Sequence, residues 1–173
     1  MSDIYVPIDY SEVKNVIPLG EDIVYSTLCK VRNTISHTMG GSTTRKWISH
    51  VLITTKGIAY TIPQKKAPIE LRYLFWYDID KVFSRGFMLR PKFKIVTEFI
   101  LAQDPNFESK ESFKERHKLF KEKLLSVIVT ALTDKQKEIE VNPDGFTKEV
   151  KVKVKDKLLK YGKALRKTEK TIN

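Results

Sequence analysis

The feature that most constrains the fold of this chain is a β-hairpin expected between residues 47 and 62. Residues 47–54 and 58–62 are two apolar, β-branched runs, and Thr55-Lys56-Gly57 lies between them. Such runs on either side of a short turn predict two paired antiparallel strands, with Gly57 at a position able to take positive φ. The centre of the chain is therefore expected to belong to a β-sheet.

Further strands are expected on both sides of this hairpin. Residues 21–35 and 69–83 are rich in β-branched and aromatic types, and each segment predicts one or two strands. Residues 37–45, which include Gly40-Gly41, are expected to form a flexible loop. Residues 92–102 alternate in polarity, which places five side chains on one face of a strand: Phe93, Ile95, Thr97, Phe99 and Leu101.

A long amphipathic helix is expected after the strands, between about residues 109 and 132. Ser112 and Glu115 have the spacing of a capping box, which predicts the start of the helix at Ser112. Apolar residues then recur at steps of three or four, and this stripe is expected to face the core: Phe113, His117, Phe120, Leu124, Val127 or Ile128, and Ala131.

The C-terminal segment has the pattern of a basic amphipathic helix over residues 147–170, with Thr147 as its N-cap. Its apolar residues recur at steps of three or four: Phe146, Val150, Val154, Leu158, Tyr161 and Leu165. Lysines occupy most of the other positions. Val150, Val152 and Val154 also alternate as in an edge strand, so that alternative stays open.

Strands followed by one long helix indicate an α+β fold and not a wound parallel sheet. We expect a bent antiparallel sheet or barrel of about six or seven strands, capped by the long helix, with the basic helix after it. The expected organisation is an N-terminal lead-in over residues 1–18, one domain over 19–135 and a basic segment over 136–173.

The charge of the chain restricts its partners. The 173 residues carry a net charge of +11, and the segment from Lys148 onward holds ten basic residues against three acidic ones. Such a field attracts phosphate-rich or acidic partners. Cys29 is the only cysteine and no apolar run is long enough to span a bilayer, so a cytoplasmic location is expected, with peripheral attachment to membranes.

The sequence offers no recognisable catalytic or metal-binding set, so we expect neither an enzyme nor a cofactor. His37, His50 and His117 lack the close spacing of structural zinc ligands, and a dyad of Cys29 with a histidine is not indicated. Residues 40–46 have the glycines of a phosphate loop but the wrong spacing. Their backbone amides could still bind an anion beside Arg45 and Lys46, or the loop could be merely solvated.

A family resemblance rests on four stretches and covers roughly residues 19–135. They are Gly20-Glu21-Asp22, the hairpin at 52–60, Ile79-Asp80-Lys81-Val82-Phe83, and residues 85–96 as a loop that leads into a strand. In this order the elements resemble the pleckstrin-homology (PH) superfold. Within it they are similar to the GLUE domain of the ESCRT-II complex.

This resemblance implies binding to phosphoinositides, to ubiquitin or a ubiquitin-like protein, and to other ESCRT subunits. The usual PH phosphate pocket has only a loose counterpart here in Lys30 and Arg32. In GLUE domains the pocket is displaced toward the loop before the late strand, which implies Arg85, Arg90, Lys92 and Lys94 as phosphate ligands here. Arg45 and Lys46 are the second candidates.

The function expected from these observations is that of a non-catalytic adaptor in ESCRT-type sorting, which binds ubiquitin, phosphoinositide membranes or both. The alternative is a nucleic-acid-binding domain. The charge suits it, and Trp47, Tyr60, Trp76 or Tyr77 could stack on bases. Against it, these aromatics lie in apolar runs, and no RNA- or DNA-binding motif is present.

Overall fold

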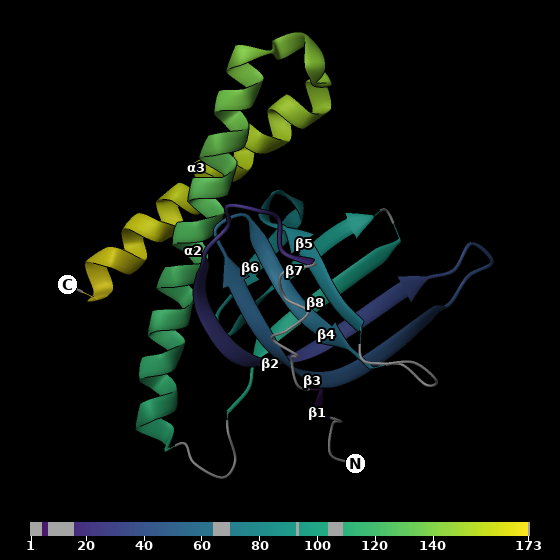
Figure 1. The fold of residues 1–173 in the computed structure, drawn as a ribbon, viewed down its shortest axis with the longest axis vertical. Coiled ribbons are helices and arrows are strands. Elements are labelled where there is room, and N and C mark those ends of the chain that lie inside the picture. The colour runs from purple at the N-terminus through teal and green to yellow at the C-terminus, as the bar shows by residue number, and fades with distance from the viewer. Residues whose placement is uncertain (1–4, 7–15, 64–69, 93, 104–108, 173) are drawn as a thin grey trace.

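A computed structural model describes residues 5–6, 16–63, 70–92, 94–103 and 109–172. One curled sheet fills the first part of the chain and two long helices follow it (Figure 1). The strands are β1 (Tyr5–Val6), β2 (Ile23–Ser36), β3 (Ser42–Thr54), β4 (Gly57–Ile62), β5 (Glu70–Phe75), β6 (Ile79–Phe83), β7 (Gly86–Lys92) and β8 (Ile95–Leu101). The helices are η1 (Trp76–Asp78), α2 (Lys110–Val141), η2 (Pro143–Gly145) and α3 (Lys148–Ile172).

The sheet consists of two antiparallel meanders joined along β2. Its strand order is β5-β4-β3-β2-β8-β7-β6, and the short β1 adds a parallel pairing to β3. β2 pairs with β3 over most of its length and with β8 from Cys29 to Ile35. The predicted α+β fold, with a bent antiparallel sheet followed by a long helix and a basic helix, is confirmed.

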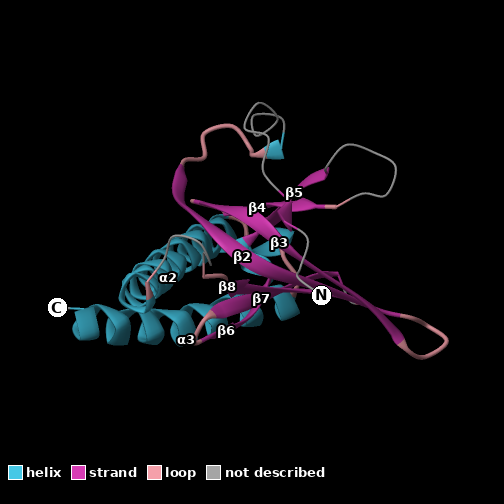
Figure 2. Cartoon of the chain, turned by 90° about the horizontal axis from the view of Figure 1, so that it is seen from below, coloured by secondary structure: helices cyan, strands magenta, loops and turns pink. Residues whose placement is uncertain are grey.

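The core lies between the concave face of the sheet and the two helices. Alternation along β2 places Cys29 and Val31 on this face, and Phe87 and Phe99 stack there with ring centroids 4.8 Å apart. α2 contributes its predicted stripe, in which Phe120 and Leu124 are buried. Figure 2 shows α2 and α3 beside each other, with α3 passing beneath α2 and reaching β6.

Helix α3 is docked through the stripe that its spacing predicted. Val154 is 5% exposed and Tyr161 is 2% exposed, and Leu158 and Leu165 pack against the same core. The Oγ1 atom of Thr147 accepts a hydrogen bond of 3.2 Å from the amide of Val150, as expected of an N-cap. The alternative of an edge strand over residues 150–154 is therefore wrong.

Three predicted boundaries are corrected. The N-cap of α2 is Ser109, which accepts from the amide of Ser112, and not Ser112 itself. α2 also continues to Val141, past the predicted end near residue 132. The turn after β2 is shorter than expected, because β3 already begins at Ser42 and pairs with β2 up to that residue.

Two further predictions, the backbone conformation of Gly57 and the loop after Arg85, are also corrected. Gly57 does not take positive φ, but a Cβ there would collide with the carbonyl oxygen of Leu74 on the neighbouring strand. Residues 86–92 form the strand β7 and not a loop, because they pair with β6 and β8. The Gln64 to Pro68 turn and Phe93 lie outside the described residues.

Candidate functional site

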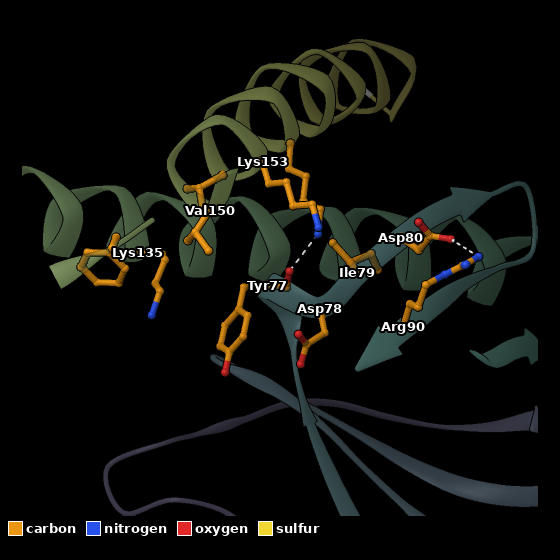
Figure 3. Close-up of a pocket in the computed structure, with 11 residues that line it drawn as sticks. Tyr77, Asp78, Ile79, Asp80, Arg90, Lys135, Val150 and Lys153 are labelled. Carbon is orange, nitrogen blue, oxygen red and sulfur yellow. Dashed lines mark hydrogen bonds and ion pairs between the residues drawn. The ribbon is translucent and has the colours of Figure 1, made fainter. Parts of the chain in front are cut away.

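Within the described residues, a groove between the end of the first meander and the two helices is a candidate site. It has a volume of about 470 Å³. Its walls come from η1 and β6, from Arg90 on β7, from Lys135 on α2, and from α3. Figure 3 shows Val150 and Lys153 on the α3 side of this groove and residues 77–80 facing them.

The floor of the groove exists because the chain changes direction at η1. Trp76 is fully buried and donates its indole N–H to the carbonyl of Thr54, at 2.9 Å. This anchor turns the next residues outward, so that Tyr77 is 41% exposed and stacks on Phe75 with 5.3 Å between ring centroids. Asp78 and Asp80 follow on the same stretch and both line the groove.

Four cationic side chains converge on the groove. Lys157 donates from Nζ to the carbonyl oxygen of Tyr77 at 2.9 Å. The Nζ atom of Lys135 lies 5.1 Å from the centroid of the Tyr77 ring, within the range of a cation–π contact. Arg90 and Lys153 complete the set. Because only two carboxylates line the same groove, its described lining carries an excess of positive charge.

The carboxylates are held differently. Asp80 forms an exposed ion pair of 3.2 Å with Arg90, drawn as a dashed line in Figure 3. Burial raises the pKa of Asp78 to about 6, and the nearby ammonium of Lys157 offsets only part of this rise. Burial in turn lowers the pKa of Lys157. Asp78 and Lys157 are thus a partly desolvated pair at the joint between η1 and α3.

The six residues predicted to bind phosphate do not form one pocket. Arg90 lies in the groove. Arg85 lies in the β6–β7 turn, roughly 17 Å from Arg90 along the strand. Its guanidinium is 5.7 Å from the centroid of the Phe113 ring. Lys94 lies in the turn at the other end of β7, with its carbonyl bonded to the amide of Ser36. Lys92 is in β7, and its side chain is outside the described part of the chain.

The second pair of candidates, on β3, is separated from Arg90 by two strands. Arg45 donates to the carbonyl of Pro63 at 2.6 Å and lies over the Trp47 ring. Lys46 is opposite Arg32 on the convex face of the sheet. With β2 and β8 between β3 and β7, Lys46 is on the order of 14 Å from the position of Arg90.

The sequence analysis missed Lys135, Lys153 and Lys157. One signal was available for Lys157, which shares the apolar stripe with Val150, Val154 and Tyr161 at steps of four, three and four. A lysine on a buried stripe has to reach a polar partner, and here that partner is the Tyr77 carbonyl. No such pattern marks Lys135.

Cys29 and His50, which were considered as a possible catalytic pair, lie on opposite faces of the sheet. Cys29 faces the core, and burial raises the pKa of its thiol to about 12, so it carries no reactive thiolate at neutral pH. His50 pairs with Leu28, the neighbour of Cys29, and therefore points to the other face of the sheet. Within the described residues, no group of three or more His, Cys, Asp and Glu side chains is placed to hold a metal ion.

The chain forms an α+β domain with a curled antiparallel sheet, a C-terminal helix and an open groove. This architecture is compatible with a PH-like fold. The sequence matches no model of a known protein family and no curated protein. Of the helices described, none is long and apolar enough to cross a membrane.

Proposed function

We propose that this chain is a non-catalytic, PH-like adaptor domain of the GLUE type. It binds the phosphate-bearing headgroup of a phosphoinositide and attaches to membranes as a peripheral protein. The observation that carries the proposal is the convergence of Arg90, Lys135, Lys153 and Lys157 on one groove of about 470 Å³. That volume lies within the usual range of small-molecule sites, about 300 to 1,000 Å³.

Two of the four cations, Arg90 and Lys153, are held in exposed ion pairs that a phosphate can replace. Arg90 is paired with Asp80, and Lys153 with Glu149 at 3.4 Å, but the side chains of both pairs are at least 42% exposed. Exposed pairs of this kind contribute about 0 to 1 kcal/mol. A phosphate can bind a guanidinium through two charge-assisted hydrogen bonds, which are stronger. Exchange of Asp80 for a ligand phosphate at Arg90 is therefore favourable.

The apolar wall of the groove suits the ring of an inositol. Tyr77, Phe146 and Val150 present aromatic and aliphatic surface beside the cations. A headgroup needs both kinds of contact, since its phosphates bind cations while the C–H surface of the ring packs on apolar atoms. This combination also disfavours a bare inorganic anion as the ligand.

The GLUE resemblance also implies ubiquitin and other ESCRT subunits as partners, and we retain these as parts of the proposal. The nucleic-acid alternative loses much of its support. Trp47, Tyr60 and Trp76 are at most 1% exposed, so they cannot stack on bases. Of the four aromatics considered, Tyr77 alone is exposed.

A titration with soluble inositol 1,4,5-trisphosphate, followed by calorimetry, tests the proposal. Arg90→Ala should weaken binding at least about tenfold, because a hydrogen bond to a charged group contributes about 1.5 to 3 kcal/mol. Arg85→Ala is the matched control, since it removes an exposed arginine from the other end of β7. It should bind like the wild type.

Three results would contradict this assignment. Unchanged affinity in Arg90→Ala would move the phosphate site elsewhere, with Arg45 and Lys46 next to be tested. Equal loss in Arg85→Ala would show general electrostatics and no groove site. Binding of ubiquitin with no binding of any inositol phosphate would leave the adaptor role without its lipid ligand.

A further inference from the structure

The outward face of α3 carries a second stripe, opposite the one that docks. Its residues recur at steps of four, three, four, four and three, which keeps them on one side of the helix: Lys148, Val152, Lys155, Leu159, Lys163 and Arg166. All six are exposed. Of the three acidic residues of the helix, Glu149 and Glu169 lie outside this stripe, and Asp156 borders it.

Docking of α3 fixes the direction in which this outward stripe points. Val154 and Tyr161 are buried against α2 and the sheet, so the helix cannot rotate without exposing them. Val152 is 50% exposed and Leu159 is 63% exposed on the opposite side. Exposed aliphatic side chains between cations match the pattern of a helix that lies on a membrane surface.

A shallow depression lies beside Leu159. It has a volume of about 350 Å³ and is lined by Lys155, Asp156, Leu158, Leu159 and Arg166. Two cations and two leucines line the same depression, a combination that suits an anionic group attached to an apolar chain. Asp156 is the one acidic residue that lines it, so the depression keeps a positive balance.

The position of α3 in the molecule allows this stripe to meet a flat partner. In Figure 2, α3 runs along the lower margin of the helical side, and α2 lies above it. The tip of the β2–β3 hairpin reaches the same margin on the other side of that view. Met39 in this tip is 97% exposed.

We propose that the outward stripe of α3 binds the surface of an anionic phospholipid bilayer, with Val152 and Leu159 entering between the headgroups. The stripe is straight and roughly 27 Å long, which suits a flat, extended anionic surface. Each basic residue near such a surface contributes about fivefold to binding. This inference goes beyond the headgroup groove, because a bilayer without any phosphoinositide satisfies it.

Co-sedimentation with vesicles of phosphatidylcholine and phosphatidylserine tests the charge contribution. The wild type should bind these vesicles, more weakly at high salt, and should not bind phosphatidylcholine alone. The double variant Lys155→Glu with Lys163→Glu should bind at least about 30-fold more weakly. The control, Lys114→Glu with Lys118→Glu on the exposed face of α2, makes the same change of charge and should retain most of the binding.

A fluorescence measurement tests insertion separately. The emission of Leu159→Trp should shift to the blue when these vesicles are added, whereas that of Leu119→Trp, at a 43% exposed position of α2, should not. Equal loss in both charge variants, or no shift for Leu159→Trp, would overturn the proposal. So would a wild type that binds a 20-base DNA oligonucleotide or polyglutamate but not the vesicles.

Vesicle binding by the α3 stripe can be tested separately from headgroup binding in the groove. The stripe variants should keep the wild-type affinity for inositol trisphosphate, and Arg90→Ala should keep its affinity for phosphatidylserine vesicles. Circular dichroism of each variant verifies that α3 remains folded, since the substituted side chains are exposed and do not pack in the core.

Discussion

The ammonium of Lys157 donates a hydrogen bond of 2.9 Å to the carbonyl oxygen of Tyr77, 80 residues earlier in the chain. This bond ties α3 to the turn between the two meanders. It also places the positive charge of Lys157 near the half-buried carboxyl of Asp78. The docking of the last helix and the ionisation of Asp78 are consequently linked.

The first prediction concerns Asp78 and pH. Burial raises the pKa of its carboxyl from 3.8 to about 6, so the folded state binds the proton more tightly than the unfolded state. Its contribution to stability is therefore present below about pH 4 and is lost as the pH rises through about 6. Asp78→Asn should unfold at a higher temperature than the wild type at pH 7.5 and at nearly the same temperature at pH 4. Asp134→Asn, on the exposed side of α2, is the control and should show no such difference.

The docking of α3 predicts opposite results for two neighbouring positions. Tyr161 is 2% exposed, and Tyr161→Ala should lower the free energy of unfolding by about 3 kcal/mol through the cavity it leaves. Leu159 is 63% exposed, and Leu159→Ala should change it by less than about 0.5 kcal/mol. Urea denaturation measures both. Similar small effects would mean that α3 is not docked in solution.

Cys29 should resist alkylation in the folded protein. Its side chain is fully buried, and burial raises the pKa of the thiol to about 12, which leaves almost no thiolate at pH 8. Iodoacetamide at pH 8 should label it only after the addition of denaturant, as mass spectrometry can show. Rapid labelling of the native protein would contradict the placement of β2 in the core.

Two glycines should respond in opposite directions to alanine. A Cβ on Gly162 would meet one atom within 4 Å, the end of the Arg166 side chain at 3.6 Å, so Gly162→Ala should stabilise α3 by about 1 kcal/mol. A Cβ on Gly86 would collide with the carbonyl oxygen of Phe99, so Gly86→Ala should destabilise the β7–β8 pairing. Thermal unfolding distinguishes them. A rise of about 2 to 4 °C is expected for Gly162→Ala.

Periodicity along the chain made much of the fold predictable. The docked stripe of α3 and the buried face of β8 follow from spacings of three to four and of two residues, which single segments display. β7 escaped this reasoning because Pro91 and the register shift between Leu89 and Lys92 interrupt its alternation. The groove could not be predicted, because Asp78, Arg90, Lys135 and Lys157 belong to four different elements that only tertiary packing brings together.

The pairing of β2 with both β3 and β8 has a consequence for how the chain acquires its structure. β3 follows β2 within a few residues, but β8 is synthesised roughly 60 residues after it, and Tyr161 of the same core later still. The first meander can form early as a set of local hairpins, yet its concave apolar face stays uncovered during that time. The core is complete only once α3 has been made, so a nascent chain halted before that helix leaves part of this apolar face exposed.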